Sequence, residues 1–318
     1  MEPKFAVFTG SSMTVPMIAV LHQRQQLACV VLPDGEMNPD LSQLTQTLGQ
    51  SDIPVIQYQN NNEAILVAQL DEVRANVGLC SFFRHQFTDV AIHYFGGQLF
   101  NLHPGDLPEY KGACPIYWQI RNGEQELFLT IHRIERHYDS GDIGAQSIVN
   151  IHPFDTLASV SEKVAQAAPL LLTEFVDAWL DQRIDWCPQA SIPHEYGKQG
   201  HENRLDSTDL MINWQQHCSQ EIADMVRAGN PLYGGAVSEF CHGQFQLVEA
   251  TATEAVFTGV KAGTVVEVSV TSGLIVRTVD RTVRLDIVST PYGVMSGYRF
   301  AQLWQINAGS ELGASACR

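Results

Sequence analysis

The sequence has few basic residues for its size. Lys and Arg number 19 among 318 residues, against 35 Asp and Glu, which gives a formal net charge of -16 at pH 7. Nucleic-acid affinity comes largely from clustered Lys and Arg that neutralise phosphates. The scarcity therefore disfavours a general nucleic-acid-binding protein, while leaving room for a local basic patch.

Long apolar runs and paired cysteines are also missing. The longest apolar stretches are far shorter than the roughly 20 residues that cross a bilayer, and Met1 to Lys4 leads into a strand-like run with no signal-peptide pattern. The seven cysteines are odd in number and widely spread, with no Cys-x-x-Cys pair. We therefore expect a cytoplasmic protein of mostly buried thiols, without a membrane segment, a disulfide framework or structural zinc.

What is present is enough apolar sequence for a large core. Hydrophobic residues make up 45% of the chain and charged residues 17%, which excludes a disordered tail. A chain of this length has two domains as the starting expectation.

The first half alternates short apolar runs with helical patterns. Continuous apolar strands separated by amphipathic helices indicate βαβ units and a parallel sheet buried on both faces. We predict an α/β fold class, with a Rossmann-like parallel sheet as an N-terminal catalytic domain over residues 1–188. Its expected strands are Phe5–Thr9, Leu27–Leu32, Pro54–Ile56, Val77–Phe82, Gln98–Leu102, Leu127–Arg133 and Gly144–Val149, and Thr156–Leu180 is an expected helix.

The composition changes after the long helical pattern. Residues 189–203 are polar, contain Pro and Gly, and predict a linker. Short alternating runs beyond it predict a small antiparallel, OB-like β-barrel as a C-terminal domain over residues 204–308, and residues 309–318 a tail.

One strand end carries the residues best suited to chemistry. Asn101 and His103 are two residues apart at a predicted strand end, so their side chains point to one face. Ligands of open parallel sheets bind beyond the carboxyl ends of strands. The Asn amide can donate to a developing oxyanion, and His103 can donate as well or relay a proton. Asp139, if nearby, would orient the imidazole and favour its charged form.

Two motifs in this region resemble the signatures of the 10-formyltetrahydrofolate-dependent formyltransferase family. The first is the Asn-x-His run followed by Leu107-Pro108, Tyr110 and Gly112, and the second is Asp139-Ser-Gly-Asp-Ile143, 36 residues after the His. The resemblance covers essentially the whole chain. Within the family, the chain is similar to the methionyl-tRNA and amino-sugar N-formyltransferase branches. Further segments that carry it are Val7–Gly10, Ser81–His85, Ile212–Trp214, Arg227–Pro231 and Gly234–Ala236.

The resemblance implies that 10-formyltetrahydrofolate is the co-substrate and that an amine receives the formyl group. By resemblance, the catalytic residues are Asn101, His103 and Asp139. The implied folate-binding residues are Ser81, Phe82, Phe83, Arg84, His85, Ser140, Gly141 and Asp142. The implied acceptor-binding residues are Gly10, Ser11, Ser12, Gly105, Asp106 and Tyr110.

Several of these residues also have simpler interpretations. Asp142 fits a turn-forming role as well as a ligand contact, and Gly10 to Ser12 fits a tight strand-to-helix turn better than a phosphate cradle, because Gly-x-Gly-x-x-Gly is absent. Arg84 could neutralise the acidic tail of folate. Cys114 fits packing better than reactivity. No third ligand at a diagnostic spacing accompanies His103 and Asp139, so we expect no metal.

The loop after the His departs from the family pattern. Pro104-Gly-Asp-Leu-Pro108 stands where the family commonly has Pro-Ser-Leu-Leu-Pro, and Asp106 would favour a cationic amine near the reaction centre. This change is expected to alter the acceptor site and to leave formyl chemistry intact.

The charge distribution favours a small-molecule acceptor. Residues 25–73 contain no Lys or Arg, and the second domain has more acidic than basic residues, which disfavours tRNA without excluding it. We expect an amino-sugar nucleotide or an amino-acid derivative as acceptor.

The alternatives are a methionyl-tRNA formyltransferase acting on initiator tRNA and a non-catalytic folate-binding module. A formyl-folate hydrolase is a further enzyme alternative. That branch resembles a formyltransferase with an added N-terminal regulatory domain, and we expect no room for such a domain before the first predicted strand. No membrane partner is expected, and a homo-oligomer is compatible with the sequence.

Overall fold

A computed structural model of the chain describes residues 2–35, 38–59, 62–193, 204–241 and 243–313. The chain divides into two compact units whose segments interleave along the sequence. The first unit comprises Met1–Gly112, Glu126–Val149 and Ser161–Glu202, and the second comprises Ala113–Gln125, Asn150–Val160 and Asn203–Arg318.

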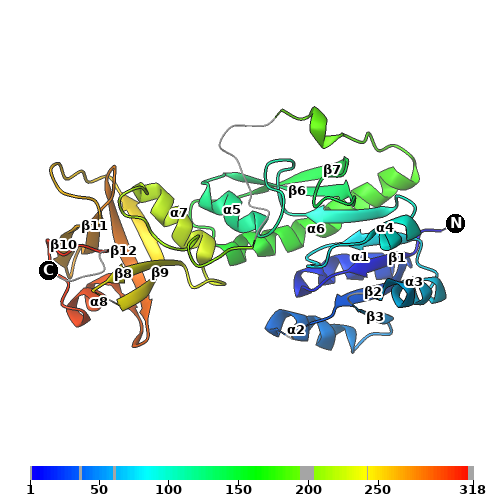
Figure 1. Cartoon of the computed structure of the whole chain (residues 1–318), viewed down its shortest axis with the longest axis horizontal. Coiled ribbons are helices and arrows are strands. Elements are labelled where there is room, and N and C mark those ends of the chain that lie inside the picture. Colours follow the sequence, from blue (N-terminus) through cyan, green and yellow to red (C-terminus); the bar gives the residue numbers. More distant parts are fainter. Residues whose placement is uncertain (1, 36–37, 60–61, 194–203, 242, 314–318) are drawn as a thin grey trace. The chain divides into compact units, whose positions relative to one another are not determined.

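The first unit is built on a seven-stranded sheet with the strand order β3-β2-β1-β4-β5-β6-β7 (Figure 1). The pairs formed by β1 to β5 are parallel, whereas β6 runs antiparallel to β5. Every residue of β1 and β4 is buried, as the continuous apolar runs predicted. The Rossmann-like α/β fold is therefore confirmed. The strands are β1 (Phe5–Phe8), β2 (Leu27–Pro33), β3 (Val55–Tyr58), β4 (Val77–Cys80), β5 (Leu99–His103), β6 (Glu126–Arg133) and β7 (Ile143–Asn150).

Helices connect the parallel strands. Helix α2 shows the amphipathic pattern expected of such helices, because Leu41, Leu44 and Leu48 lie on one buried face. The Asn38 side chain caps its first turn by accepting from the Leu41 N–H at 2.9 Å. No helix in the described part of the chain is both long and apolar enough to span a membrane. The helical elements that cross over between strands are η1 (Ser12–Thr14), α1 (Val15–Gln23), α2 (Pro39–Leu48), α3 (Glu63–Glu72) and α4 (Asp89–Tyr94), and α6 (Leu157–Leu180) follows β7.

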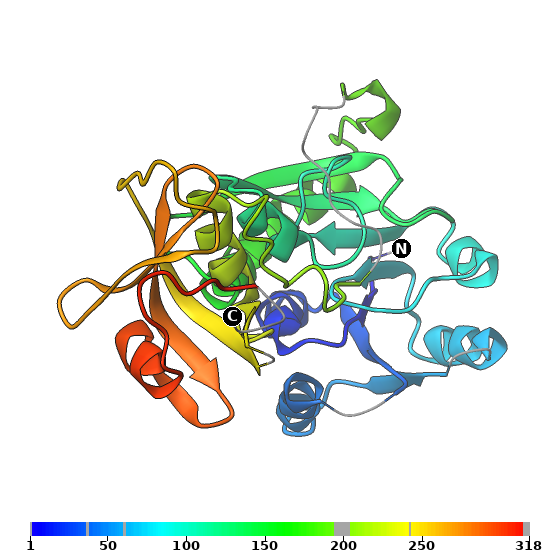
Figure 2. The ribbon, with the colours of Figure 1, turned by 60° about the vertical axis from the view of Figure 1, so that its left-hand side comes forward.

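The second unit contains an antiparallel sheet, as the alternating pattern predicted. The strand order is β10-β11-β12-β9-β8, and β13 pairs with β12 (Figure 2, yellow to orange). Its core includes Trp214, Phe245 and Phe300, and the Trp214 indole N–H donates to Ser238 Oγ at 2.9 Å. Its elements are α5 (Pro115–Arg121), α7 (Ser219–Gly229), β8 (Ala236–Phe240), β9 (Gly243–Thr253), β10 (Val265–Ser269), β11 (Gly273–Arg277), β12 (Thr282–Thr290), β13 (Gly293–Ser296) and α8 (Gly297–Leu303).

The cysteines differ in part from the expectation. Cys29 and Cys80 are buried free thiols, and burial raises the pKa of Cys29 to about 12. Cys187, however, is exposed, and Cys241 is disulfide-bonded. The odd number and wide spacing of the cysteines did not predict this disulfide.

Candidate active site

Strands β5 and β6 together place three polar side chains on one face of the first sheet. Asn101 and His103 are two residues apart on the strand and so share a face, opposite to the apolar Phe100 and Leu102. In the antiparallel pairing with β6, Asn101 lies directly opposite His132. Cross-strand neighbours project to the same side of a sheet, so His132 joins the two residues that the sequence predicted.

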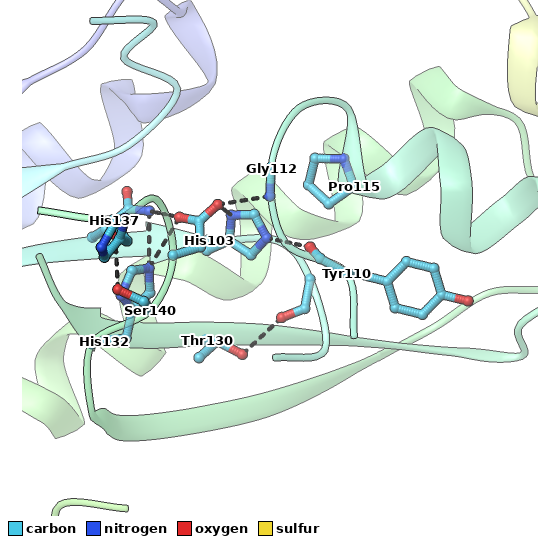
Figure 3. Close-up of polar contacts among 12 residues, drawn as sticks. His103, Tyr110, Gly112, Pro115, Thr130, His132, His137 and Ser140 are labelled. Carbon is cyan, nitrogen blue, oxygen red and sulfur yellow. Dashed lines mark hydrogen bonds and ion pairs between the residues drawn. The ribbon is translucent and has the colours of Figure 1, made fainter. Parts of the chain in front are cut away.

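The carboxylate of Asp139 connects this group (Figure 3). Its Oδ1 accepts from Asn101 Nδ2 at 3.1 Å and lies 3.4 Å from His132 Nε2. Its Oδ2 accepts from the Gly112 N–H at 2.9 Å and lies 3.6 Å from His103 Nδ1. The structure therefore brings together Asn101, His103 and Asp139, the three predicted catalytic residues.

The surroundings of Asp139 keep its carboxyl group ionised. Burial alone would raise its pKa, but the attraction of His103 and His132 and the hydrogen bond from the Gly112 N–H together hold that pKa well below the usual range. The residue has a φ of 48°, in the left-handed region that Asp adopts more readily than most residues.

His103 is buried, with about 5% of its surface exposed. Burial lowers its pKa and outweighs Asp139 and the Tyr110 carbonyl, which raise it, while His132 lowers it further. The lowered pKa favours the neutral imidazole at physiological pH. Asp139 raises the pKa of His103, which is the direction expected from the sequence, but burial has the larger effect.

The hydrogen bonds assign the ring protons of both histidines. His103 Nε2 lies 2.7 Å from the Tyr110 carbonyl oxygen, so Nε2 carries the proton and Nδ1 is the basic atom facing Asp139. His132 Nδ1 lies 2.7 Å from the Arg133 carbonyl, so Nδ1 donates there and Nε2 is an acceptor, 3.1 Å from Asn101 Nδ2. The Asn101 amide thus directs one N–H to Asp139 and the other to His132.

The loop after β5 lies against His103. A Cβ at Gly105 would be 2.6 Å from His103 Nε2 and 2.7 Å from the Tyr110 carbonyl oxygen, so only glycine fits this close approach. Thr130 Oγ1 donates to the Gly105 carbonyl at 2.9 Å (Figure 3). Asp106 is half-buried, and its carbonyl accepts from the Tyr110 N–H at 2.8 Å. The Tyr110 ring is buried, and the residue contacts His103 through its backbone.

The predicted turn after β1 forms a hydrogen-bonded bend. The Gly10 N–H donates to the Phe82 carbonyl at 3.2 Å, and the Ser11 hydroxyl caps η1 by accepting from the Met13 N–H at 3.3 Å. Both the N–H, at 2.9 Å, and the hydroxyl of Ser12 donate to the Asp40 carboxylate. This is the tight strand-to-helix turn that the sequence favoured over a phosphate cradle.

The segment after β4 combines a buried hydroxyl with aromatic rings. Ser81 is buried, and its Oγ has no hydrogen-bond partner among the described residues. Phe82 has a left-handed φ of 53°. The Phe83 ring lies 5.3 Å from the ring of His85. Arg84 is exposed and forms no ion pair within the described part of the chain.

The turn around Asp139 is held mainly by its backbone. Ser140 Oγ donates to the His137 carbonyl at 2.9 Å (Figure 3), and the Asp142 carbonyl accepts from the Arg133 N–H at 3.0 Å. A Cβ at Gly141 would lie 2.1 Å from the Arg133 carbonyl oxygen, so this position requires glycine. These contacts give Ser140, Gly141 and Asp142 structural roles in the turn.

Two residues of this region were missed by sequence reasoning. His132 stands in a predicted strand, and only the antiparallel register of β5 and β6 places it opposite Asn101. Gln189 begins the predicted linker, yet its side chain is buried and donates to the backbone of the Asp139 turn. Residues 194–203 of that linker lie outside the described residues. Among those described, no three His, Cys, Asp or Glu side chains gather to hold a metal ion.

Comparison with known protein families gives two matches. Residues 4–176 match the formyl transferase family, and residues 204–301 match the formyl transferase C-terminal domain family. The first match includes both Asn101 and Asp139.

Solved structures share the fold at low sequence identity. A sugar 3N-formyl transferase, WlaRD, crystallised in the presence of dTDP and 5-N-formyl-THF, is 17% identical, with a TM-score of 0.66 over 89% of this chain and 97% of WlaRD. A sugar N-formyltransferase from a Shewanella species is 18% identical, with a TM-score of 0.58 over 74% of this chain and 92% of that protein. HypX from Aquifex aeolicus, in complex with tetrahydrofolic acid, is 15% identical, with a TM-score of 0.60; it is matched over 98% of this chain, which spans 49% of HypX.

Proposed function

Since the chain belongs to the formyl transferase family, we propose that it moves the formyl group of 10-formyltetrahydrofolate to an amine of a small-molecule acceptor. The observation that carries this proposal is the single cluster formed by Asn101, His103 and Asp139 at the end of β5. The folate supplies the formyl group in an activated form, so the protein needs no covalent nucleophile. What it must supply is a base for the amine proton and donors for the developing oxyanion.

We assign the base to His103. Its imidazole is neutral at rest, and Nδ1 is the ring nitrogen that the Tyr110 carbonyl does not engage. A proton taken up at Nδ1 creates an imidazolium 3.6 Å from the ionised Asp139 carboxylate. Because that charge forms in a buried site, its attraction to the carboxylate is much stronger than in water. Asp139 therefore stabilises the charge that appears during transfer.

We assign the oxyanion donor to Asn101. One of its amide N–H groups is held by Asp139, and this bond orients the amide. The second N–H points to His132 Nε2 at 3.1 Å and is the one that can be given to a developing oxyanion. His132 thus serves as the resting partner of this N–H.

A substitution at His132 tests this arrangement. His132→Phe keeps a ring in the buried strand but removes the acceptor, leaving the Asn101 amide free to turn. We expect kcat to fall by about tenfold to a hundredfold, because misplacing one oxyanion donor has effects up to this order. His132→Gln, which restores a side-chain acceptor, should recover part of the loss. Steady-state kinetics of both variants beside wild type measure this, and equal activity of all three would remove His132 from the site.

The segment after β4 suits a folate ring. The unpartnered, buried Ser81 Oγ and the rings of Phe83 and His85 offer a hydrogen-bonding group beside aromatic surface. Cys80, the residue before Ser81, pairs with Asn101 in the sheet, which puts this segment beside the catalytic strand end. We propose that Ser81 to His85 hold the folate and that the exposed Arg84 guanidinium attracts its acidic tail. The similar structures crystallised with a folate support a folate as the ligand.

We propose a small-molecule amine, an amino-sugar nucleotide or an amino-acid derivative, as acceptor. Asp106 lies on the loop that contacts His103, and Asp40 anchors the turn at Ser12, so acidic side chains stand near two of the predicted acceptor segments. The net charge of -16 disfavours a polyanion such as tRNA. The sugar N-formyltransferases among the similar structures support an amino-sugar nucleotide as the first acceptor to try.

A formyl-transfer assay with 10-formyltetrahydrofolate tests the acceptor. Charged initiator tRNA, amino-sugar nucleotides and diamino acids are compared under the same conditions. We expect turnover with one small amine and none with tRNA. Turnover with tRNA alone would overturn the charge argument, and folate binding without transfer to any amine would favour a folate-binding module.

A further inference from the structure

The chain segment after α6 returns to the strands of the active site. Cys187 pairs with Ile143 through two backbone hydrogen bonds of 2.9 Å, at the point where the Asp139 turn enters β7. Trp186 stacks on Phe100 of β5, with ring centroids 5.9 Å apart, and the Arg133 guanidinium lies 4.0 Å from the centroid of the Trp186 ring. This segment lies beyond residues 4–176, which match the family.

Gln189 makes the most specific contact of this segment. Its side-chain Nε2 donates to the Asp139 carbonyl and to the Gly141 carbonyl, each at 2.8 Å, and the side chain is only about 5% exposed. Its Oε1 has no partner among the described residues. The amide orientation is therefore fixed, because the opposite orientation would place Oε1 against two carbonyl oxygens.

Gln189 binds the backbone of the Asp139 turn, which has an unusual conformation. Asp139 has a left-handed φ of 48°, and a Cβ at Gly141 would contact the Arg133 carbonyl, so the turn follows a narrow path. Such conformations persist when surrounding contacts determine them. Two hydrogen bonds from one buried amide cross the turn on either side of Ser140 and fix the direction of the Asp139 side chain.

We propose that Gln189, carried by the Trp186–Gln189 segment, is a positioning residue that holds the Asp139 carboxylate against Asn101, His103 and His132. The expected effect of Gln189 on turnover rests on the proposed function. The positioning itself is a property of the unliganded protein and can be measured without any acceptor.

The variant that tests it is Gln189→Met, which keeps the length of the side chain and removes both N–H donors. We expect kcat to fall by about tenfold to a hundredfold, since small displacements of a catalytic group have effects of this order, with little change in the KM for folate. In the unliganded protein, NMR titration of the imidazoles should show the pKa of His103 lowered further. The reason is that the carboxylate that raises this pKa would no longer be held in place, whereas His132 and the Tyr110 carbonyl still face the ring.

Gln119→Met is the matched control. Gln119 is also fully buried and donates to a backbone carbonyl, that of Pro115 at 2.9 Å, but it lies in the second unit. We expect this variant to lower the melting temperature and to leave the His103 titration unchanged. The same pattern in Gln189→Met, a loss of stability with an unchanged His103 titration, would overturn the proposal.

Two further outcomes are separated by the same measurements. If wild type transfers no formyl group but Gln189→Met shifts the His103 titration, the proposed function fails and the positioning role stands. If Gln189→Met does not fold, Gln189→Asn keeps an amide on a shorter side chain that cannot reach both carbonyls. We expect the shifted titration in that variant as well, and a wild-type titration in it would contradict the role.

Discussion

Replacing His103 with alanine should reduce kcat by about a thousandfold, the range of a lost general base, while folate binding is largely retained. The imidazole is neutral because burial lowers its pKa, and its Nδ1 faces the Asp139 carboxylate. The alanine variant lacks the imidazole, which is the only group that we propose as the acceptor of the amine proton. The folate segment after β4 is a separate part of the chain, so affinity for folate should change little.

The control for His103 is a histidine that lies outside the site. His22 is on α1, about half exposed, and 3.8 Å from Asp52. His22→Ala should transfer formyl groups at the wild-type rate. Formyl transfer by His103→Ala at an undiminished rate would remove His103 from the mechanism, and a parallel loss of folate binding would show that the variant had damaged the pocket instead.

Changing Asp139 to asparagine should lower kcat about a hundredfold to a thousandfold, because the imidazolium formed during transfer loses the carboxylate that stabilises it. The pH dependence should move as well. The Asp139 charge raises the pKa of His103, so removing that charge lowers it further. A base is active above its pKa, and the rise of kcat with pH should therefore shift to lower pH, with a lower plateau.

The measurement is a pH–rate profile of Asp139→Asn against wild type. Asp177→Asn is a matched control, since the pKa of Asp177 is also lowered, through its hydrogen bond to Arg24, but the Asp177 side chain is about half exposed. This control should keep the wild-type profile. If Asp139→Asn shows the wild-type profile too, its carboxylate has no part in the protonation of His103.

The same variant should change acid stability with a definite sign. Folding lowers the pKa of Asp139 from its ordinary value of 3.8, so its carboxylate contributes stability at pH values above that figure. The contribution is lost as the pH falls toward the lower, folded-state pKa. The difference in free energy of unfolding between wild type and Asp139→Asn should therefore be largest at neutral pH and decrease in strong acid.

The central part of the site was predictable because it depends on local pattern. An apolar strand that ends in Asn101-Leu-His103 places both polar side chains on one face of the sheet, whatever surrounds it. The residues between the strand and Gly112 were also recognisable, since glycine and proline mark a loop. Asp139 was identified by its motif, although its distance from His103 could come only from the structure.

The rest depended on contacts between distant segments. His132 becomes part of the site through the register of β5 and β6, which nothing in its own strand encodes. Gln189 follows Pro188 in a polar stretch that resembles a linker, yet it is buried against a turn 50 residues earlier. The neutral state of His103 depends on the balance between burial and the Asp139 charge, and residue types alone do not give that balance.

Transfer of an isotope from folate to the acceptor tests the central claim most directly. 10-Formyltetrahydrofolate labelled with carbon-13 in its formyl group is incubated with the enzyme and a small amine, and both products are followed by NMR. The account predicts an N-formyl amine and tetrahydrofolate in equal amounts, with both formed about a thousandfold more slowly by His103→Ala. Labelled folate that stays bound and intact with every amine, or formate released in place of the N-formyl product, would contradict it.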